Sequence, residues 1–239
     1  MNSIHKLLFW LLLLLLPFSL QAQSSFREGR ITYQADTVRR LERQPAAYIA
    51  TQLVVYRKAE STRLEVWLVN RFNPGDTQRA IHVRNLAGTY TWFEFSDSTR
   101  AAYGNLALFV SYEEEQELQQ AQALAQPDRR LQPGKVLQRV QWLGLPAERI
   151  ALTKSTNEQA EAVVTKAIDL SLGALFPAVL SLPGTPLQFT DSEHGWGWLT
   201  KYTATKLAPQ SVSGNLFVVD PSLKVVSLTE SRQMISNFD

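Results

Sequence analysis

Short segments in which apolar and polar residues alternate recur along most of this chain, and they constrain its fold more than any other feature. In residues 30–35, for example, Ile31, Tyr33 and Ala35 all fall on one side of an extended strand. Alternation with a period of two places one side of a strand on a core and the other side in solvent. Further strands of apolar, β-branched or alternating composition are predicted at 48–57, 64–69, 80–85, 89–95, 136–143, 149–152, 161–166, 187–190, 216–220 and 223–228.

Turn signals and two helical segments interrupt these strands. The sequence Asn73-Pro74-Gly75-Asp76 is a strong turn signal. Residues 113–126 contain good helix formers, with acids at the start, where they suit the helix dipole. Residues 169–180 carry apolar residues at helical spacing, although Pro177 must kink or end such a helix. The pattern predicts a mainly β (α+β) protein: one antiparallel β domain with two or three helical insertions.

The first 22 residues are expected to lie outside this fold. Lys6 precedes the apolar run LLFWLLLLLLPFSL, and Ala22 is a small residue at a cleavage position. This is the pattern of a secretory signal peptide, and the run is shorter than the roughly 20 residues of a membrane-spanning helix. We expect cleavage after Ala22, leaving a single β-rich domain at residues 23–239 in the periplasm or outside the cell. An uncleaved anchor is the alternative.

The composition excludes several classes of function. The chain has no cysteine, which rules out disulfides, thiol catalysis and a lipidated cysteine after the leader. A chain of this length can bury a core without such cross-links. The formal net charge is +2 and the charges of both signs are interspersed, so nucleic acid is not an expected partner. No second apolar run reaches membrane length, and the mature chain is not expected to span a membrane.

Catalytic and metal-binding motifs are missing from the sequence. It contains no Gly-x-Ser-x-Gly elbow, Ser-x-x-Lys, P-loop or dinucleotide fingerprint. Scattered acids leave a carboxylate-pair hydrolase formally open, but none is expected to pair on an apolar inner face, where a raised pKa would arise. Asp191, Glu193 and His194 crowd one predicted turn without a fourth ligand for zinc, and His82 is expected to be an ordinary strand residue. We therefore predict no catalytic residue, no metal ligand and no cofactor.

A hairpin with several aromatic residues is predicted at residues 184–206. Trp196, Trp198, Tyr202 and Ala204 fall on one face of its second strand, while the opposite face carries Lys201 and two threonines. Aromatic side chains bury large areas and make strong cross-strand contacts. The favoured interpretation is that this face belongs to the core, and the alternative is that it lines a ligand cavity.

Several short motifs resemble one group of secreted proteins. Residues 26–33 (FREGRITY), 182–189 (LPGTPLQF) and 203–207 (TATKL) are similar to segments of envelope proteins from Bacteroidetes-type bacteria, in the domain-of-unknown-function and GLPGLI groups. Weaker matches lie at 144–147, 164–169 and 216–221, and Ala147 stands where some members have a cysteine. The resemblance implies a single curved antiparallel sheet or half-barrel with two or three helices packed against it, similar to periplasmic lipoprotein carriers. Gly184 and Pro186 look like turn residues, so no functional site is carried over.

Two functions remain open from these observations. The first is a non-enzymatic exported protein that binds a lipid or another hydrophobic ligand in an apolar sheet cavity. Its candidate ligand-binding residues are the aromatic residues on predicted strands: Trp67, Trp92, Trp142, Trp196, Trp198 and Tyr202. The alternative is an envelope protein-interaction or structural module with a solid core, acting through its surface or its edge strands. A segment 169–180 that fills the concave face would weaken the first hypothesis.

Overall fold

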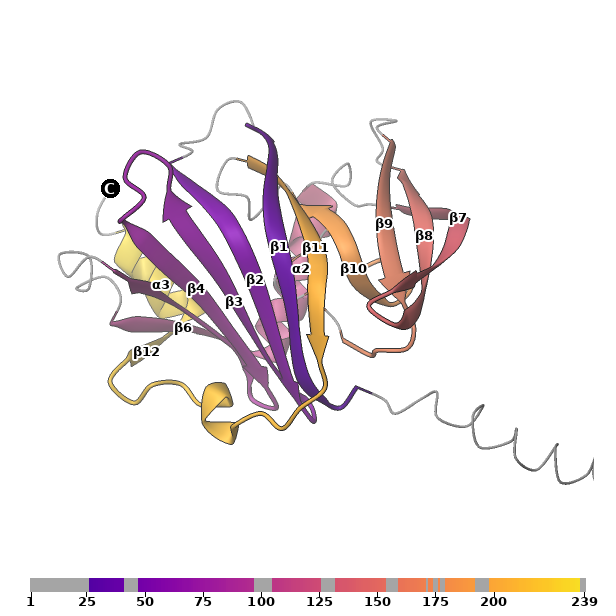
Figure 1. Ribbon diagram of the computed structural model, residues 1–239. Helices are drawn as coiled ribbons and strands as arrows, with labels where there is room; N and C mark the ends of the chain where they lie inside the picture. The colour runs from indigo at the N-terminus through magenta and orange to yellow at the C-terminus, as the bar shows by residue number, and fades with distance from the viewer. Residues whose placement is uncertain are drawn as a thin grey trace, which may run out of the picture.

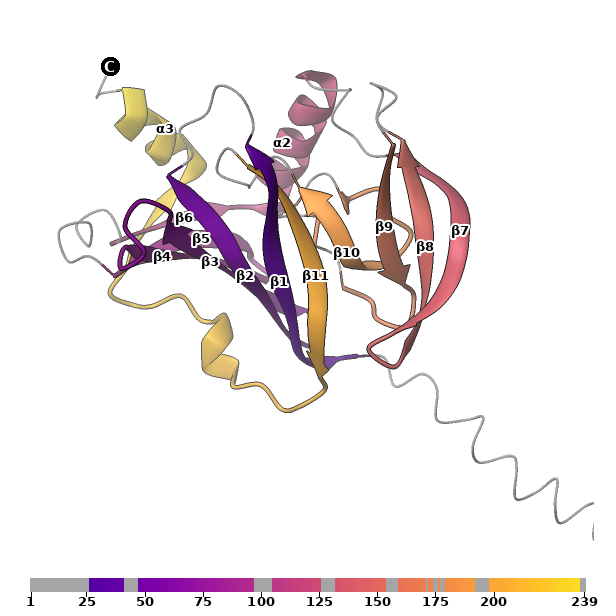
Figure 2. The same ribbon diagram turned by 45° about the horizontal axis from the view of Figure 1, so that its top comes forward.

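Twelve strands form one strongly curved sheet that does not close into a barrel (Figures 1 and 2). The computed structural model describes residues 26–40, 47–96, 105–125, 132–153, 159–170, 172–173, 176, 179–191 and 198–236. The strand order is β12-β6-β5-β4-β3-β2-β1-β11-β10-β9-β8-β7. The strands are β1 (Glu28–Arg40), β2 (Tyr48–Lys58), β3 (Ser61–Asn70), β4 (Thr77–Asn85), β5 (Gly88–Phe95), β6 (Leu106–Val110), β7 (Gln132–Trp142), β8 (Leu145–Thr153), β9 (Gln159–Thr165), β10 (Thr185–Asp191), β11 (Trp198–Ala208) and β12 (Lys224–Ser227).

The mainly β prediction is confirmed, with one correction to the sheet. Neighbouring strands are antiparallel except at one edge, where β12 pairs with β6 in parallel, so the sheet is mixed. The alternating pattern does not predict β6, because the five residues of this strand form an unbroken apolar run. The β10–β11 hairpin forms as predicted, with Phe189 opposite Tyr202.

Within the described residues, two α-helices accompany the sheet, and each starts at a reciprocal cap. Helix α2 (Tyr112–Ala125) follows Ser111, whose Oγ accepts from Glu114 N at 3.3 Å while Glu114 Oε2 accepts from Ser111 N at 2.9 Å. Ser227 and Glu230 repeat this capping box at α3 (Leu228–Ser236). The helix predicted at 113–126 is confirmed as far as Ala125, whereas α3 was not expected from the sequence. Figures 1 and 2 show the sheet curving around the side on which α2 lies.

The prediction of a strand at 216–220 is wrong. Residues Gly214–Phe217 form the short 3-10 helix η4, capped by the Ser213 side chain, which accepts from Asn215 N. Phe217 is buried against the sheet while Val218 is 62% exposed. The apolar residues of this segment therefore cover a face of the sheet instead of adding a strand to it.

The main hydrophobic cluster occupies the inner, concave face of the sheet. Cross-strand partners share a face, and the pairs Ile31–Val55 and Leu53–Val66 carry the inner face from β1 through β2 to β3. The segment of residues 168–182 packs into the same cluster through the buried residues Ile168, Leu170, Leu172, Phe176, Val179 and Leu182. The helix predicted at 169–180 lies partly outside the described residues. Where described, the segment makes single turns, such as the one closed by Phe176 N and Leu172 O at 2.8 Å.

A smaller cluster lies on the outer face, over β4, β5 and β6. It contains Ile81, Val83, Trp92 and Ala107 from the sheet, together with Val212 and Phe217. The last two belong to residues 209–223, called the strap below, which cross the outer face between β11 and β12 (Figure 1). Among the described residues, no helix is both long and apolar enough to cross a membrane.

Candidate functional site

The aromatic residues proposed from the sequence do not gather on one face. Tyr202 lies on the inner face, since it pairs with Ala35 and Phe189. Trp92 lies on the outer face, because the register joins it through Ile81 to Glu65 of β3. Trp67 pairs with Arg79 on the same outer face. The sheet therefore separates Trp67 and Trp92 from Tyr202, and no single cavity wall contains all three.

Tyr202 is a core residue of the inner cluster. It is 0% exposed, its ring stacks on Phe189 at a centroid distance of 5.1 Å, and Phe176 lies 5.2 Å from each of these two rings. Burial raises the pKa of the Tyr202 phenol, and the nearby Asp191 charge raises it further. The predicted buried parity of this strand is confirmed for Tyr202 and for Ala204, which is 3% exposed.

Trp142 joins two strands that are far apart in the sheet order. It lies at the end of β7, and its Nε1 donates a hydrogen bond to the carbonyl oxygen of Ala204 in β11 at 3.0 Å. Strands β10, β9 and β8 separate β11 from β7 in the sheet, so this contact requires that end of the sheet to curl back on itself. Trp142 is half-buried and packs on the inner cluster.

The structure does not describe the side chains of the two remaining tryptophans of the predicted set. Trp196 lies outside the described residues, as do Glu193 and His194. Trp198 begins β11, but only its backbone belongs to the described part of the chain. Ligand binding by the six aromatic residues stays a prediction.

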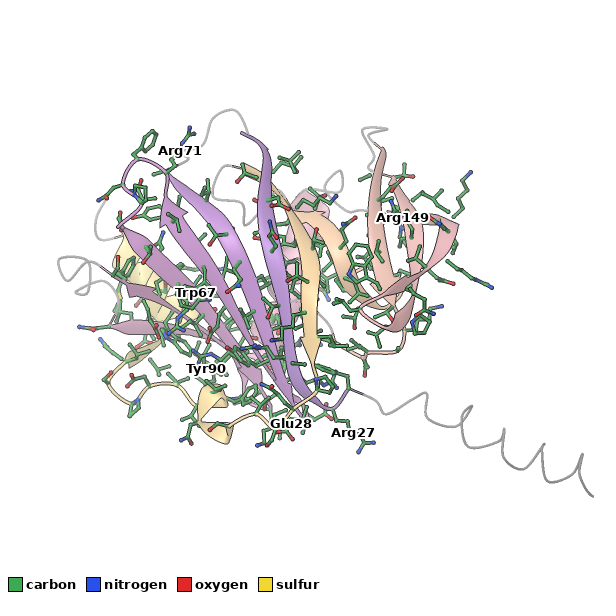
Figure 3. All side chains as sticks on the ribbon, in the orientation of Figure 1. Arg27, Glu28, Trp67, Arg71, Tyr90 and Arg149 are labelled. Carbon is green, nitrogen blue, oxygen red and sulfur yellow. The ribbon has the colours of Figure 1, made fainter. Side chains whose placement is uncertain are left out.

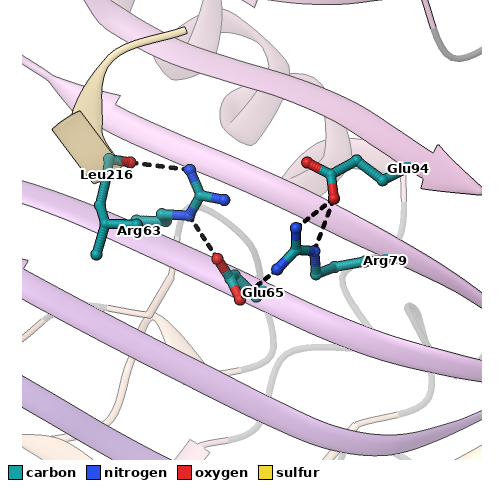
Figure 4. A network of polar contacts seen from close by, with 5 residues as sticks. All are labelled: Arg63, Glu65, Arg79, Glu94 and Leu216. Carbon is teal, nitrogen blue, oxygen red and sulfur yellow. Dashed lines mark hydrogen bonds and ion pairs between the residues drawn. The ribbon is translucent and has the colours of Figure 1, made fainter. Parts of the chain in front are cut away.

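The outer face carries a buried network of charges beside Trp67 and Trp92 (Figure 4). Arg63 Nε donates to Glu65 Oε1 at 2.6 Å, and Arg63 Nη1 donates to the carbonyl oxygen of Leu216 in the strap at 2.9 Å. Arg79 Nη1 donates to Glu65 Oε2 at 3.3 Å, and its other nitrogens bind Glu94 Oε2. Glu65 is 3% exposed, so it is a buried carboxylate held between two guanidinium groups.

Each guanidinium of this network also lies over an indole ring. Arg63 lies 5.5 Å from the ring centroid of the buried Trp92, and Arg79 lies 5.0 Å from that of Trp67. Trp67, whose side chain is labelled in Figure 3, is 40% exposed. Burial acts to lower the pKa of Arg79, but its hydrogen bonds and ion pairs with Glu94 and Glu65 raise it overall. Trp67 and Trp92 are therefore the stacking partners of a structural ion network.

Charged side chains also hold the start of the strap. Lys58 Nζ donates to the carbonyl oxygen of Val212 at 2.7 Å, and Glu28 Oε1 accepts from Val212 N at 2.6 Å. The hydrogen bond from Val212 lowers the pKa of the Glu28 carboxyl, and the nearby Lys58 charge lowers it further. The strap is therefore fastened at two places, by Glu28 and Lys58 at Val212 and by Arg63 at Leu216.

The residues considered above for metal binding are described only in part. No group of three or more histidines or acids among the described residues is arranged to hold a metal ion. His82 Nδ1 lies 2.8 Å from Thr91 Oγ1, in keeping with an ordinary strand residue. Asp191 belongs to β10, not to the predicted turn, and it is fully buried on the inner face opposite Thr200. Asp191 is a single acid on the inner face, whereas the sequence argument excluded only a pair of acids there.

The feature that sequence reasoning missed is the exposure of β7. This strand ends the sheet order, and residues 132–139 are all exposed, on both faces of the strand. Val136 is 48% exposed and Leu137 is 41% exposed. The pairing with β8 shifts register between Pro133 and Val136 and again between Val136 and Gln138. A low apolar content in QPGKVLQR is the only sequence signal of this exposure.

Comparisons with known proteins leave the chain without an assigned family. No family model matches it, and no curated protein matches it by sequence. An uncharacterized conserved protein from Thermus thermophilus has a TM-score of 0.44 and 10% identity, over 83% of this chain and 90% of that chain. A chain of the MucA/MucB complex of Pseudomonas aeruginosa has a TM-score of 0.35 and 10% identity, over 85% of this chain and 60% of that chain. MucB in complex with MucA(peri) has a TM-score of 0.32 and 12% identity, over 85% of this chain and 58% of that chain. Likenesses this distant carry no argument about function.

Proposed function

We propose that this protein is an exported, non-enzymatic module that binds another protein of the cell envelope, and that the sheet edge formed by β7 is its binding surface. The observation that carries the proposal is the exposure of residues 132–139 on both faces of an edge strand. The apolar leader predicted before residue 23 supports export. The partner is therefore expected in the periplasm or outside the cell.

The packing of the inner face favours this function over a lipid carrier. A carrier needs an open apolar face, but the inner face beside β10 and β11 is occupied by residues 168–182 of the chain itself. Thr185 fixes this segment, because its Oγ1 donates to Ile168 O at 2.8 Å and accepts from Leu170 N at 2.9 Å. Phe176 then packs against the stacked rings of Phe189 and Tyr202 at 0% exposure.

The geometry of β7 suits recognition of an extended polypeptide. An edge strand has backbone N–H and C=O groups that point away from its sheet neighbour and can pair with an added strand. Such pairing supplies affinity through the backbone, while exposed side chains such as Val136 and Leu137 supply contacts that set specificity. The strand has eleven residues, which is long enough for several successive backbone hydrogen bonds.

The proposal is tested by site-specific photo-crosslinking in the native cell. A photoreactive residue replaces Leu137 in the full chain, and the control replaces Leu86, which is 84% exposed in the turn between β4 and β5. We expect a discrete cross-linked protein from position 137 and none from position 86. That protein is then purified and mixed with this one, and amide hydrogen exchange at residues 134–141 must slow. Exchange that slows elsewhere but not on β7, or a lipid adduct in the native mass spectrum of the purified chain, would contradict the proposal.

A further inference from the structure

We propose that the segment bound at β7 is an extended, acidic stretch of the partner protein, which adds to the sheet as a further strand. This inference rests on the proposed function and specifies the chemistry of its partner. The supporting observation is that β7 carries two exposed cations, Lys135 and Arg139, and no acid.

Neither cation is fully neutralised within the described part of the chain. Arg139 is 88% exposed at its side chain, and its Nε lies 3.8 Å from Glu148 Oε1. That separation exceeds hydrogen-bonding distance, so the guanidinium keeps its donors for a partner's carboxylate. Lys135 is exposed and makes no ion pair with any described residue. An added strand with carboxylates opposite these two positions gains charge-assisted hydrogen bonds at both.

The spacing of the edge residues defines a pattern for the partner. Val136 and Leu137 lie between the two cations and are both largely exposed. A complementary strand would carry two acids about four residues apart, with apolar or β-branched residues between them. Burial of Val136 and Leu137 by those residues adds an apolar contribution to the backbone pairing.

A second copy of this chain is a poorer occupant of the same edge. Two β7 strands that pair antiparallel about Leu137 would place Lys135 of each copy opposite Arg139 of the other. Like charges directly opposite one another destabilise an antiparallel pair. The cations therefore disfavour self-pairing while they favour an acidic strand.

Edge cations also protect sheets against aggregation, and this simpler role makes a different prediction. If Lys135 and Arg139 act only as such a guard, their neutralisation would cause self-association and leave the binding of an acidic peptide unchanged. If they recognise the partner, their neutralisation weakens that binding. The two roles are therefore separated by one pair of variants.

The probe is a short synthetic peptide in which two glutamates flank Val-Thr-Val, compared with the same peptide carrying lysine in place of glutamate. A third peptide keeps the glutamates but is N-methylated at alternate residues, which blocks strand pairing. Binding to the full mature chain is measured by fluorescence anisotropy, and amide hydrogen exchange locates the site. The double variant Lys135→Gln/Arg139→Gln is matched by Lys206→Gln/Arg232→Gln, which removes two cations from β11 and α3 instead.

We expect the acidic peptide to bind at least about tenfold more tightly than the basic one, a difference of about 1.4 kcal/mol. Binding should protect residues 134–141 from exchange, weaken with added salt, and weaken about tenfold on N-methylation. Lys135→Gln/Arg139→Gln should abolish the preference for acid, and the matched variant should keep it. Equal binding of both peptides at β7 would overturn the acidic partner but leave the proposed function standing. No protection of β7 by either peptide would overturn both the acidic partner and the proposed function. If Lys135→Gln/Arg139→Gln self-associates but binds the acidic peptide as tightly as the unchanged chain, the cations only protect the edge against aggregation.

Discussion

The two faces of the sheet are closed by different kinds of interaction. The inner face is packed by the described residues of 168–182, whose buried side chains are apolar, and Phe176 packs against two aromatic rings that stack on each other. The outer face is covered by the strap, which is fastened by Lys58, Arg63 and Glu28. One strand serves both: β3 points Leu64 and Val66 inward and Arg63 and Glu65 outward, all four of them buried.

Because of this difference, the two faces should respond differently to pH and salt. Apolar burial depends weakly on pH and salt, whereas charged hydrogen bonds depend on the protonation of their partners. The inner face should therefore determine global stability, and the outer face should be the part that opens under mild changes of conditions. The following substitutions and titrations test that division.

The largest effect is expected from Phe176→Ala. Phe176 is 0% exposed, and removal of its ring leaves a void beside the stacked rings of Phe189 and Tyr202. We expect the free energy of unfolding to fall by about 3–5 kcal/mol, measured by urea denaturation. The matched control is Phe72→Ala, since Phe72 is 77% exposed and should change stability by less than about 0.5 kcal/mol. A loss below about 1 kcal/mol for Phe176→Ala would mean that the inner face tolerates a void, which would favour the ligand-carrier hypothesis.

A smaller loss is expected from Glu65→Gln on the outer face. The amide oxygen can still accept one hydrogen bond, but Arg63 remains buried without its carboxylate. We expect a cost of about 2 kcal/mol, together with faster amide exchange in the strap near Leu216. Glu94→Gln is the control, because Glu94 contacts Arg79 from a side chain that is 46% exposed and should cost below about 1 kcal/mol. If the two variants lost equal amounts of the free energy of unfolding, burial of the network would add nothing to stability.

Most strands could be predicted from the sequence because alternation directly reports a sheet with a core on one side. That rule located β1, β3, β4, β5 and the hairpin β10–β11, and it placed Tyr202 in the core, whereas β2 was predicted from its β-branched and aromatic composition. The same rule does not show which of two buried faces a side chain occupies. Trp92 and Tyr202 both look like core aromatics, but they lie on opposite faces, and only the register of the strands between them shows this.

The features that sequence reasoning missed depend on contacts between distant residues. The strap looked like a strand because residues 216–219 are apolar, but Arg63, far away in the chain, binds Leu216 O and holds it across the sheet. The exposure of β7 follows from its place at the end of the strand order, which no local pattern encodes. In the sequence, the candidate binding edge was therefore marked only by the low apolar content of residues 132–139, whereas alternation marked the core of the fold.

Alkaline titration should act on the inner face. Burial raises the pKa of Tyr33 and of Tyr202 above the usual value of 10.0. A raised pKa in the folded state means that the stabilisation is complete below pH 10 and is lost as the pH rises above it. Each tyrosine should then lower the free energy of unfolding by about 1.4 kcal/mol per pH unit above 10. Phenolate absorbance should appear together with loss of the near-ultraviolet circular dichroism signal, and Tyr202→Phe should reduce this dependence. Phenolate formation without unfolding would contradict the burial of these rings.

Acid should act on the outer face instead, with the smallest effect. The pKa of Glu28 lies below its usual 4.5, first because its carboxylate accepts a hydrogen bond from Val212 N and then because Lys58 lies nearby. The stabilisation from a lowered pKa is present above 4.5 and is lost as the pH falls through the folded-state value. We expect the start of the strap to loosen below pH 4.5 while the inner cluster stays folded, which is measured by amide exchange at residues 211–213 against residues 202–204.

The variant Glu28→Gln separates this local event from general acid unfolding. The amide cannot lose a charge, so the protection of residues 211–213, taken relative to intrinsic exchange at the same pH, should be lower than in the unchanged chain at neutral pH and should no longer fall with acid. If instead the strap of Glu28→Gln still loosens below pH 4.5, another acid controls it, and Asp220 is the next to test, because Ser222 lowers its pKa through hydrogen bonds from its backbone N and its hydroxyl. In either case the strap should open before the inner face does, since hydrogen bonds to charged side chains hold the strap and packed rings hold the inner face.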